Sequence, residues 1–126
     1  MNLNDYASEA HEANKRWWDC LYCEQLRFVT ADDVSPMICP YCAGTGSQKR
    51  NLGELLMLAV SELAEALEGA RKGLQDYQLP QYKMFDGEIV ECFIRLFDIA
   101  GVMIPDLQEI YDAKMEFKRG WEDARN

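Results

Sequence analysis

The chain has 126 residues, which is enough for one domain, 1–126, with a hydrophobic core of its own. Apolar residues make up 48% of it and charged residues 28%, as in ordinary globular proteins. With 22 acids against 13 bases the formal net charge is −9, which argues against a nucleic-acid binder because such proteins carry a basic surface. No apolar run is long enough to span a membrane, and the N-terminus lacks the apolar core of a signal peptide. We therefore expect a cytoplasmic protein without a membrane partner.

Two segments in the first half of the chain have a helical pattern. Residues 4–18 predict a helix with one weakly apolar face, and Asn4 is its expected N-cap. From Asn51 onward, leucine and alanine at helical spacing predict a second and longer helix, which ends near Gly69 or Gly73.

A small insert, residues 19–43, lies between these two helices and contains two pairs of cysteines and a short strand candidate, LRFV at 26–29. The predicted metal ligands are Cys20, Cys23, Cys39 and Cys42. Their spacing, C-x2-C-x15-C-x2-C, fits a tetrahedral Zn²⁺ site, and a reducing compartment favours a metal over disulfides. Four thiolates leave no open position for catalysis, so the zinc is predicted to be structural.

The insert has an alternative interpretation as a ribbon that recognises a partner protein or nucleic acid. Arg27 is the only basic residue between the paired cysteines, so the insert has little with which to bind phosphates. The acidic residues there are Glu24, Asp32 and Asp33. The fifth cysteine, Cys92, falls in an apolar segment and is expected to be a small buried side chain.

The second half of the chain predicts two further helices. Residues 74–86 contain a proline and no clear period, so we expect a loop. The third helix is predicted from about residue 87 to 100, with Gly101 as the residue that ends it. Pro105 suits the first position of a fourth helix that runs to about Asp123. The sequence therefore predicts an all-α fold, an antiparallel bundle of four helices per chain with a small zinc-binding insert between the first two.

Two acidic pairs lie on the predicted second and third helices, namely Glu62 with Glu65 and Glu88 with Glu91. On the third helix, Arg95 and Asp98 continue the same polar stripe within an arc of roughly 80°. The rest of that helix is apolar nearly all round, which indicates burial. Facing carboxylates repel unless a cation joins them, and oxygen ligands suit Mg²⁺. An ExxE pair alone is often a solvated stripe, but the apolar surroundings of the third helix favour a metal site.

These motifs resemble the MazG-like all-α nucleoside triphosphate pyrophosphohydrolases, in which ExxE is followed by ExxD. The resemblance rests on ELAE at 62–65 and EIVE at 88–91, and it extends to AHEANKRWW at 10–18. Glu91 stands where the family usually has aspartate. The resemblance implies that Glu62, Glu65, Glu88 and Glu91 bind catalytic Mg²⁺, with Asp98 as a further candidate ligand. Water would then attack the α-phosphorus of a nucleoside triphosphate, most suitably a dNTP, to give the monophosphate and pyrophosphate.

The resemblance also suggests substrate contacts. Lys15 and Lys114 lie in segments that match the phosphate-binding ones of the family, and Arg95 lies on the polar stripe. On the first helix, His11, Trp17 and Trp18 could stack on the base or form hydrogen bonds with it. In the alternative interpretation, one tryptophan fills the core and the other covers the ribbon.

Two conclusions about assembly and function follow. A short chain of four helices cannot cover a third helix that is apolar on most sides, so we predict a homodimer or a dimer of dimers. The preferred function is Mg²⁺-dependent hydrolysis of a nucleoside triphosphate. The alternative is a non-catalytic MazG-like module whose zinc ribbon docks a protein or nucleic-acid partner.

Overall fold

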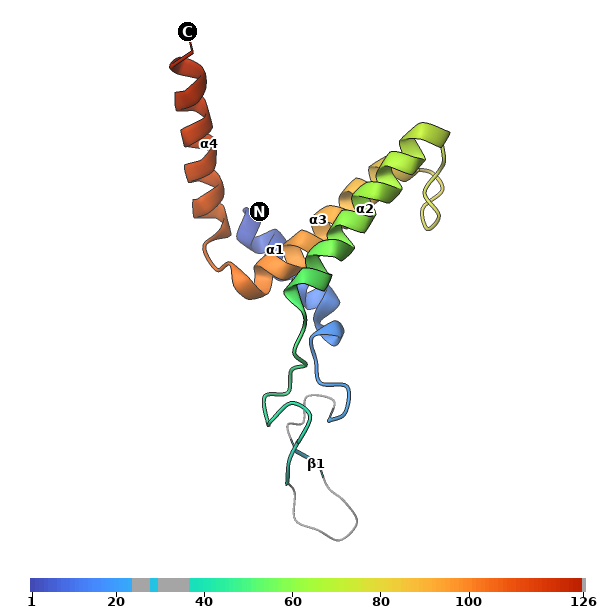
Figure 1. Cartoon of the computed structure of the whole chain (residues 1–126), viewed down its shortest axis with the longest axis vertical. Helices are drawn as coiled ribbons and strands as arrows, with labels where there is room; N and C mark the ends of the chain where they lie inside the picture. Colours follow the sequence, from blue (N-terminus) through green and yellow to red (C-terminus); the bar gives the residue numbers. More distant parts are fainter. Residues whose placement is uncertain (24–27, 30–36, 126) are drawn as a thin grey trace.

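The computed structural model describes residues 1–23, 28–29 and 37–125, with the backbone alone for Phe28 and Val29. Its helices are α1 (Leu3–Asn14), the short 3-10 helix η1 (Lys15–Trp17), α2 (Leu52–Lys72), α3 (Met84–Met103) and α4 (Leu107–Asp123) (Figure 1). The predicted all-α class is confirmed, with four α-helices in the described part of the chain.

The helices α2 and α3 lie side by side and run in opposite directions (Figure 1). α2 begins after Asn51, whose side chain accepts a hydrogen bond from the N–H of Glu54 at 3.0 Å. It ends before Gly73, which is in the left-handed conformation with φ of 63°. Of the two predicted ends for this helix, the later one is therefore confirmed. The predicted loop is confirmed but ends earlier than predicted, because α3 begins at Met84 and not near residue 87.

The helix α1 packs across α3, and its start differs from the predicted one. Asn2 is the N-cap, and it forms a capping box with Asp5. The prediction of Asn4 as N-cap is wrong, because the Oδ1 atom of Asn4 accepts a hydrogen bond from the N–H of Gln108 at 3.0 Å. Asn4 thus ties the first turn of α4 to α1. The α-helical part ends at Asn14, earlier than predicted, and continues as η1.

Gly101 lies inside α3, so the prediction that it ends the helix is wrong. A Cβ atom at this position would lie 2.6 Å from the carbonyl oxygen of Ala7 and 2.8 Å from the Cβ of His11. Gly101 therefore marks the place where α1 crosses α3, and the missing side chain lets the two backbones approach closely.

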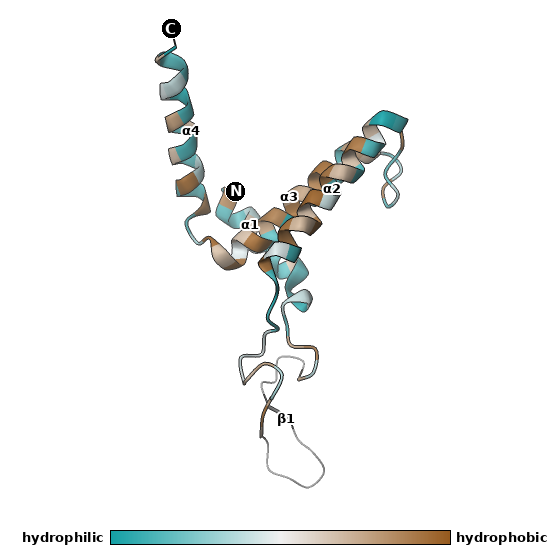
Figure 2. Cartoon of the chain, viewed as in Figure 1, coloured by the Kyte–Doolittle hydropathy of each residue, from teal (hydrophilic) through white to brown (hydrophobic). Residues whose placement is uncertain are grey.

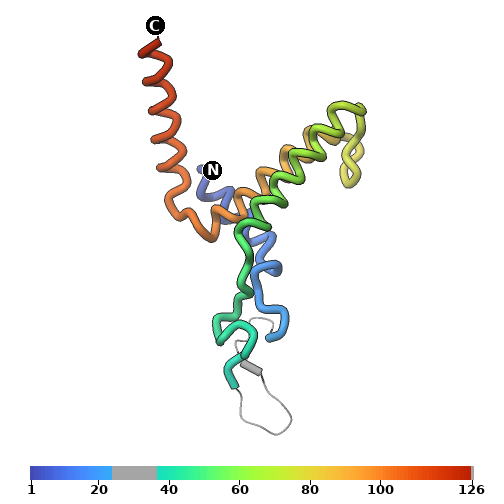
Figure 3. Tube along the Cα trace, in the orientation of Figure 1, coloured from blue at the N-terminus to red at the C-terminus, as the bar shows by residue number. Residues whose placement is uncertain are grey.

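The helix α4 diverges from the α2–α3 pair (Figures 1 and 3). It begins at Leu107 after the cap residue Asp106, so the prediction of Pro105 as its first residue is wrong by two positions. Its first turn is held by Asn4 and by a hydrogen bond from the N–H of Leu3 to Oε1 of Gln108 at 2.8 Å. No described residue of α4 is buried within the single chain.

The insert contains one pair of short antiparallel strands, β1 (Phe28–Val29) and β2 (Met37–Ile38), with Phe28 opposite Ile38 and Val29 opposite Met37. The strand candidate LRFV is therefore confirmed at Phe28–Val29. Its first half, Leu26 and Arg27, lies outside the described residues, as do Glu24, Asp32 and Asp33.

The buried core of the single chain is small and consists mainly of short side chains where α1, α2 and α3 meet. Its apolar members on the helices are Ala7, Ala10, Leu55, Ala59, Ala66, Cys92, Ile99 and Ala100. Large apolar side chains remain exposed along the outer faces of α2 and α3, where hydrophobic residues dominate in Figure 2. Within the described ranges, no helix is both long and apolar enough to cross a bilayer.

Candidate functional site

Three acidic side chains converge between α2 and α3. Glu62 and Glu65 come from consecutive turns of α2, and Glu88 comes from the second turn of α3. One carboxylate oxygen from each lies within 4.8 Å of the others. Two ligands on opposite sides of an octahedral Mg²⁺ ion are about 4.2 Å apart, given bonds of about 2.1 Å. The donors are therefore of the right kind, and close enough, to hold a hard divalent cation after small side-chain movements.

Arg95 partly neutralises this acidic cluster. Its Nε donates a hydrogen bond to Oε1 of Glu62 at 2.5 Å. Burial favours the protonated form of Glu62, but the hydrogen bonds from Arg95 and Glu88 and the charge of Arg95 outweigh it. The pKa of Glu62 therefore lies below its ordinary value.

The pKa of Glu88 is shifted in the opposite direction, upward. Burial, its hydrogen bond to Glu62 and the negative charges of Glu65 and Glu62 together raise the pKa of Glu88 to about 7. In the absence of a cation, the cluster thus retains a proton near neutral pH. A divalent cation would relieve the same repulsion, so its binding would compete with that of the proton.

The acidic cluster opens into a cavity of about 390 Å³. Its other walls come from Glu91 and Arg95 of α3, from Met84, and from the loop residues Asp76, Tyr77 and Gln78. Asp76 is held in a tight turn, because its Oδ1 accepts hydrogen bonds from the N–H groups of Gln78 and Leu79 at 2.8 Å each. The loop therefore shapes one side of the carboxylate cavity.

Glu91 and Asp98 are placed differently from the three clustered acids. Glu91 lines the carboxylate cavity but is not one of the three residues whose oxygens lie within 4.8 Å of one another. Asp98 lies elsewhere, since its Oδ1 accepts hydrogen bonds from His11 at 2.9 Å and Trp18 at 3.0 Å, and Trp18 also contacts its Oδ2 at 3.1 Å. The structure thus brings Asp98 together with two of the predicted base-contact residues rather than with the acidic cluster.

A second cavity, of about 360 Å³, lies next to the first and shares Glu91 and Arg95 with it. Its remaining walls are Asn14, Trp17, Arg50, Leu55, Leu58, Ile94, Asp98 and Ile99. We call it the Trp17 cavity. It combines an aromatic ring, two guanidinium groups and a buried carboxylate with apolar side chains of α2 and α3, a mixture of apolar and polar groups that small-molecule sites use.

Of the predicted phosphate-binding lysines, neither lines these cavities. Lys15 lies in η1 and Lys114 lies on α4, both with exposed side chains. The sequence analysis also missed Arg50, Asn14 and the loop residue Asp76. None of these three belongs to a periodic pattern, although an aspartate in a loop before a helix is a recognisable turn signal.

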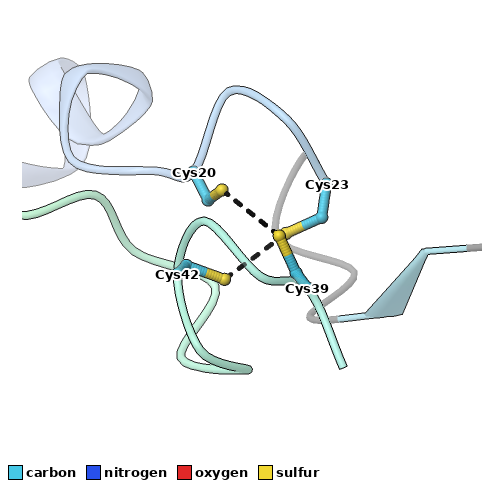
Figure 4. Close-up of side chains that lie close together, drawn as sticks. All are labelled: Cys20, Cys23, Cys39 and Cys42. Carbon is cyan, nitrogen blue, oxygen red and sulfur yellow. Dashed lines mark hydrogen bonds between the residues drawn. The ribbon is translucent and has the colours of Figure 1, made fainter. Parts of the chain in front are cut away.

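The four paired cysteines meet at one point at the base of the insert (Figure 4). Their sulfur atoms are 3.9 Å apart for Cys20 and Cys39 and 3.7 Å apart for Cys23 and Cys42. A tetrahedral zinc ion with Zn–S bonds of about 2.3 Å requires sulfurs about 3.8 Å apart. All four side chains are buried, so the cluster can hold a metal ion such as zinc.

The backbone around Cys42 favours a thiolate. Burial tends to raise the pKa of the Cys42 thiol, but the N–H of Gly46, at 3.3 Å from its Sγ, and the neighbouring thiols lower the pKa to about 6. The backbone that presents this N–H turns back on itself, with positive φ at Ala43, Gly44 and Gly46. Such N–H···S contacts are typical support for a metal-bound thiolate.

The base of the insert connects this cysteine cluster to the Trp17 cavity. The N–H of Cys20 donates to the carbonyl of Gly46 at 2.9 Å, and the N–H of Gln48 donates to the carbonyl of Trp18 at 2.8 Å. The carbonyl of Trp17 accepts hydrogen bonds from the Gln48 side chain and from Nη1 of Arg50, the latter at 2.9 Å. Hydrogen bonds therefore connect the segments on either side of the cysteine cluster to Trp17 and Arg50, two residues that line the cavity.

Comparisons with protein families, with curated proteins and with solved structures give no match to this chain. The resemblance to MazG-like enzymes therefore rests on the sequence motifs alone.

Proposed function

We propose that this protein is a Mg²⁺-dependent nucleoside triphosphate pyrophosphohydrolase. The observation that carries the proposal is the convergence of Glu62, Glu65 and Glu88 from two helices on one cavity. The resemblance of both acidic motifs to those of MazG-like enzymes supports the same activity. A chain with a net charge of −9 that binds a triphosphate needs a divalent cation between its carboxylates and the phosphates.

The residues have separate roles in this proposal. Glu62, Glu65 and Glu88 would hold the cation, and Glu91, which lines the same cavity, is the candidate for a fourth ligand. Bound Mg²⁺ would neutralise phosphate charge and acidify a water molecule. The water oxygen forms a bond to the α-phosphorus while the bond from that phosphorus to the pyrophosphate oxygen breaks. The proton that the water loses passes to one of the carboxylates. Arg95 lines both cavities, so it is placed to contact the phosphates between them.

The test is pyrophosphate release by the full chain with Mg²⁺ and a panel of dNTPs and NTPs, with and without a chelator. Glu62→Gln and Glu88→Gln should each abolish release. Glu68→Gln is the matched control, because Glu68 lies on the same helix but is exposed and pairs with Lys72. The proposal fails if no nucleotide in the panel is hydrolysed, or if the Glu62 and Glu88 variants keep full activity.

The same proposal includes a homodimer as the active species. The isolated chain exposes 9855 Å², whereas a folded monomer of 14.5 kDa exposes about 6,900 Å². Obligate homodimer interfaces bury about 2,000–5,000 Å² or more in total, which is about 1,000–2,500 Å² per chain, so the excess surface of each chain is more than enough to supply such an interface. A dimer of dimers would need a second interface on each chain.

A second candidate function is favoured by one observation on the insert. Several large apolar side chains are exposed around the cysteine cluster, and Tyr22 and Tyr41 pack together with ring centroids 4.3 Å apart. Exposed aromatic clusters are typical of protein-docking surfaces. In this alternative the chain is a non-catalytic module that docks a partner protein through the insert. It requires that no triphosphate is hydrolysed, so the pyrophosphate assay separates the two functions.

A further inference from the structure

We infer that Asp98 is a specificity-determining residue that selects a nucleobase carrying an exocyclic amino group, bound in the Trp17 cavity. The inference rests on the proposed function and goes beyond it in naming the substrate class. The observation behind it is a carboxylate that is almost fully buried, fixed in orientation and yet part of a cavity wall. Asp98 is 8% exposed and lines the Trp17 cavity.

The Trp17 cavity is placed to receive the nucleoside part of a triphosphate. It shares Glu91 and Arg95 with the carboxylate cavity, so one ligand can occupy both, with its phosphates at the acidic cluster and its base beyond Arg95. The apolar walls from α2 and α3 and the ring of Trp17 suit the faces of a planar ring.

The hydrogen bonds of Asp98 decide which edge of a base it can read. His11 and Trp18 both donate to Oδ1, and only Trp18 also contacts Oδ2, at the longer distance of 3.1 Å. An ionised carboxylate has about four acceptor positions and no donor. Oδ2 therefore keeps acceptor capacity for a ligand, and His11 and Trp18 hold the group still while it is used.

A carboxylate discriminates strongly between amino and carbonyl groups. The 4-amino group of cytosine or the 6-amino group of adenine donates an N–H to Oδ2. Uracil and hypoxanthine present a carbonyl oxygen at the same position, and two acceptors repel each other in a buried site. Discrimination of this kind is large because the unmatched polar group stays buried without a partner.

Two pairs of substrates test this contact. Within each pair, a carbonyl oxygen replaces the amino group and the adjacent ring nitrogen gains a proton. We expect kcat/KM for dCTP to exceed that for dUTP by about tenfold or more, and dATP to exceed dITP in the same way. In Asp98→Asn, whose amide N–H can donate to a carbonyl, the dCTP-to-dUTP ratio should fall by at least about tenfold. A purely structural role of Asp98 would lower activity on both substrates by the same factor and leave the ratio unchanged, which would overturn the inference.

A binding measurement separates failure of this inference from failure of the proposed function. Without added Mg²⁺, quenching of tryptophan fluorescence reports the binding of dCMP and dUMP to the full zinc-containing chain without any chemistry. Tighter binding of dCMP that is lost in Asp98→Asn supports the inference even if no triphosphate is hydrolysed. Hydrolysis without preference for the amino-bearing member of each pair overturns the inference about Asp98 but still supports the proposed pyrophosphohydrolase activity. Since the wild-type preference is itself decisive, the inference stays falsifiable if Asp98→Asn does not fold.

Discussion

Arg95 on α3 donates a hydrogen bond from Nε to Oε1 of Glu62 on α2 at 2.5 Å, and Glu62 is the most buried of the three clustered acids. This contact joins the two helices at the candidate metal site. It also explains how a buried carboxylate remains ionised among other acids. Burial alone would raise the pKa of Glu62, but the hydrogen bond and the charge of Arg95 lower it.

Removing the guanidinium group of Arg95 should therefore destabilise the chain. We expect Arg95→Met to lower the free energy of unfolding by about 1–3 kcal/mol, because it leaves the Glu62 carboxylate buried without its partner. Urea unfolding without Mg²⁺ measures the change. Lys72→Met, which breaks the exposed pair with Glu68, is the control and should cost less than about 1 kcal/mol. Equal effects of the two substitutions would contradict this account of Glu62.

The raised pKa of Glu88 predicts how stability depends on pH. The folded chain keeps the Glu88 proton up to about pH 7, whereas the unfolded chain loses it near the ordinary value of 4.5. Between these values the folded state binds more protons, so stability is greatest below the unfolded pKa and falls as pH rises towards 7. Thermal unfolding without Mg²⁺ at pH 5 and pH 7.5 should show this loss, and Glu88→Gln should reduce it.

The raised pKa of Glu88 also predicts how Mg²⁺ binding depends on pH. A cation must displace the Glu88 proton below about pH 7, so affinity should rise with pH up to that value and then level off. Titration calorimetry at pH 6 and pH 8 measures the difference directly. An affinity that is independent of pH would show that Glu88 is not a ligand.

Removing a zinc ion from a loaded cysteine cluster should affect substrate binding more than the chemical step of the proposed reaction. The hydrogen bonds from Gln48 and Arg50 to the carbonyl of Trp17 join the insert to the Trp17 cavity. Loss of the metal should therefore raise KM several-fold with a smaller change in kcat, while most of the helical circular dichroism remains. Cys39→Ser should lose the zinc measured by elemental analysis, whereas Cys92→Ser, also at a buried thiol, should retain it.

The apolar surface of α2 predicts the oligomeric state. Leu56, Val60, Leu63 and Leu67 form a continuous stripe and are each 44–51% exposed in the single chain. Leu63→Glu should convert a dimer to a monomer in light scattering coupled to size exclusion, because a charge cannot be buried there. Ser61→Glu places the same charge on another side of the helix and should leave the dimer intact. A wild-type monomer at micromolar concentration would refute the dimer.

The sequence could predict features that depend on local spacing. Helical periodicity located α2, the cysteine spacing indicated the four-thiol cluster, and Glu62 and Glu65 fell on one face of a helix. Each of these patterns is repeated within a few residues, so it does not depend on how the helices are packed.

Features that depend on how the helices cross could not be predicted. Glu88 and Asp98 share one polar stripe of α3, yet they lie ten residues and about 15 Å apart along the axis. Glu88 faces α2, while Asp98 lies near the crossing with α1 and bonds to His11. Periodicity shows that these residues share one face of the helix, but it does not show which helices pack against that face. For this reason the sequence alone groups Asp98 with the metal ligands.

Gly101 offers the sharpest test of that crossing. Gly101→Ala should destabilise the chain by about 1–3 kcal/mol, because the new methyl group would lie 2.6 Å from the carbonyl oxygen of Ala7 and would push α1 away from α3. Gly120→Ala is the matched control, since it lies in α4 with no atom within 4 Å of the added carbon. In a helix interior, that change should instead stabilise the chain by about 0.5–1 kcal/mol.

Opposite signs of the two changes in the free energy of unfolding, measured with urea, would support the tight crossing. Stabilisation by both substitutions would show that α1 does not rest on α3 at Gly101, and it would remove the support for the contact between His11 and Asp98.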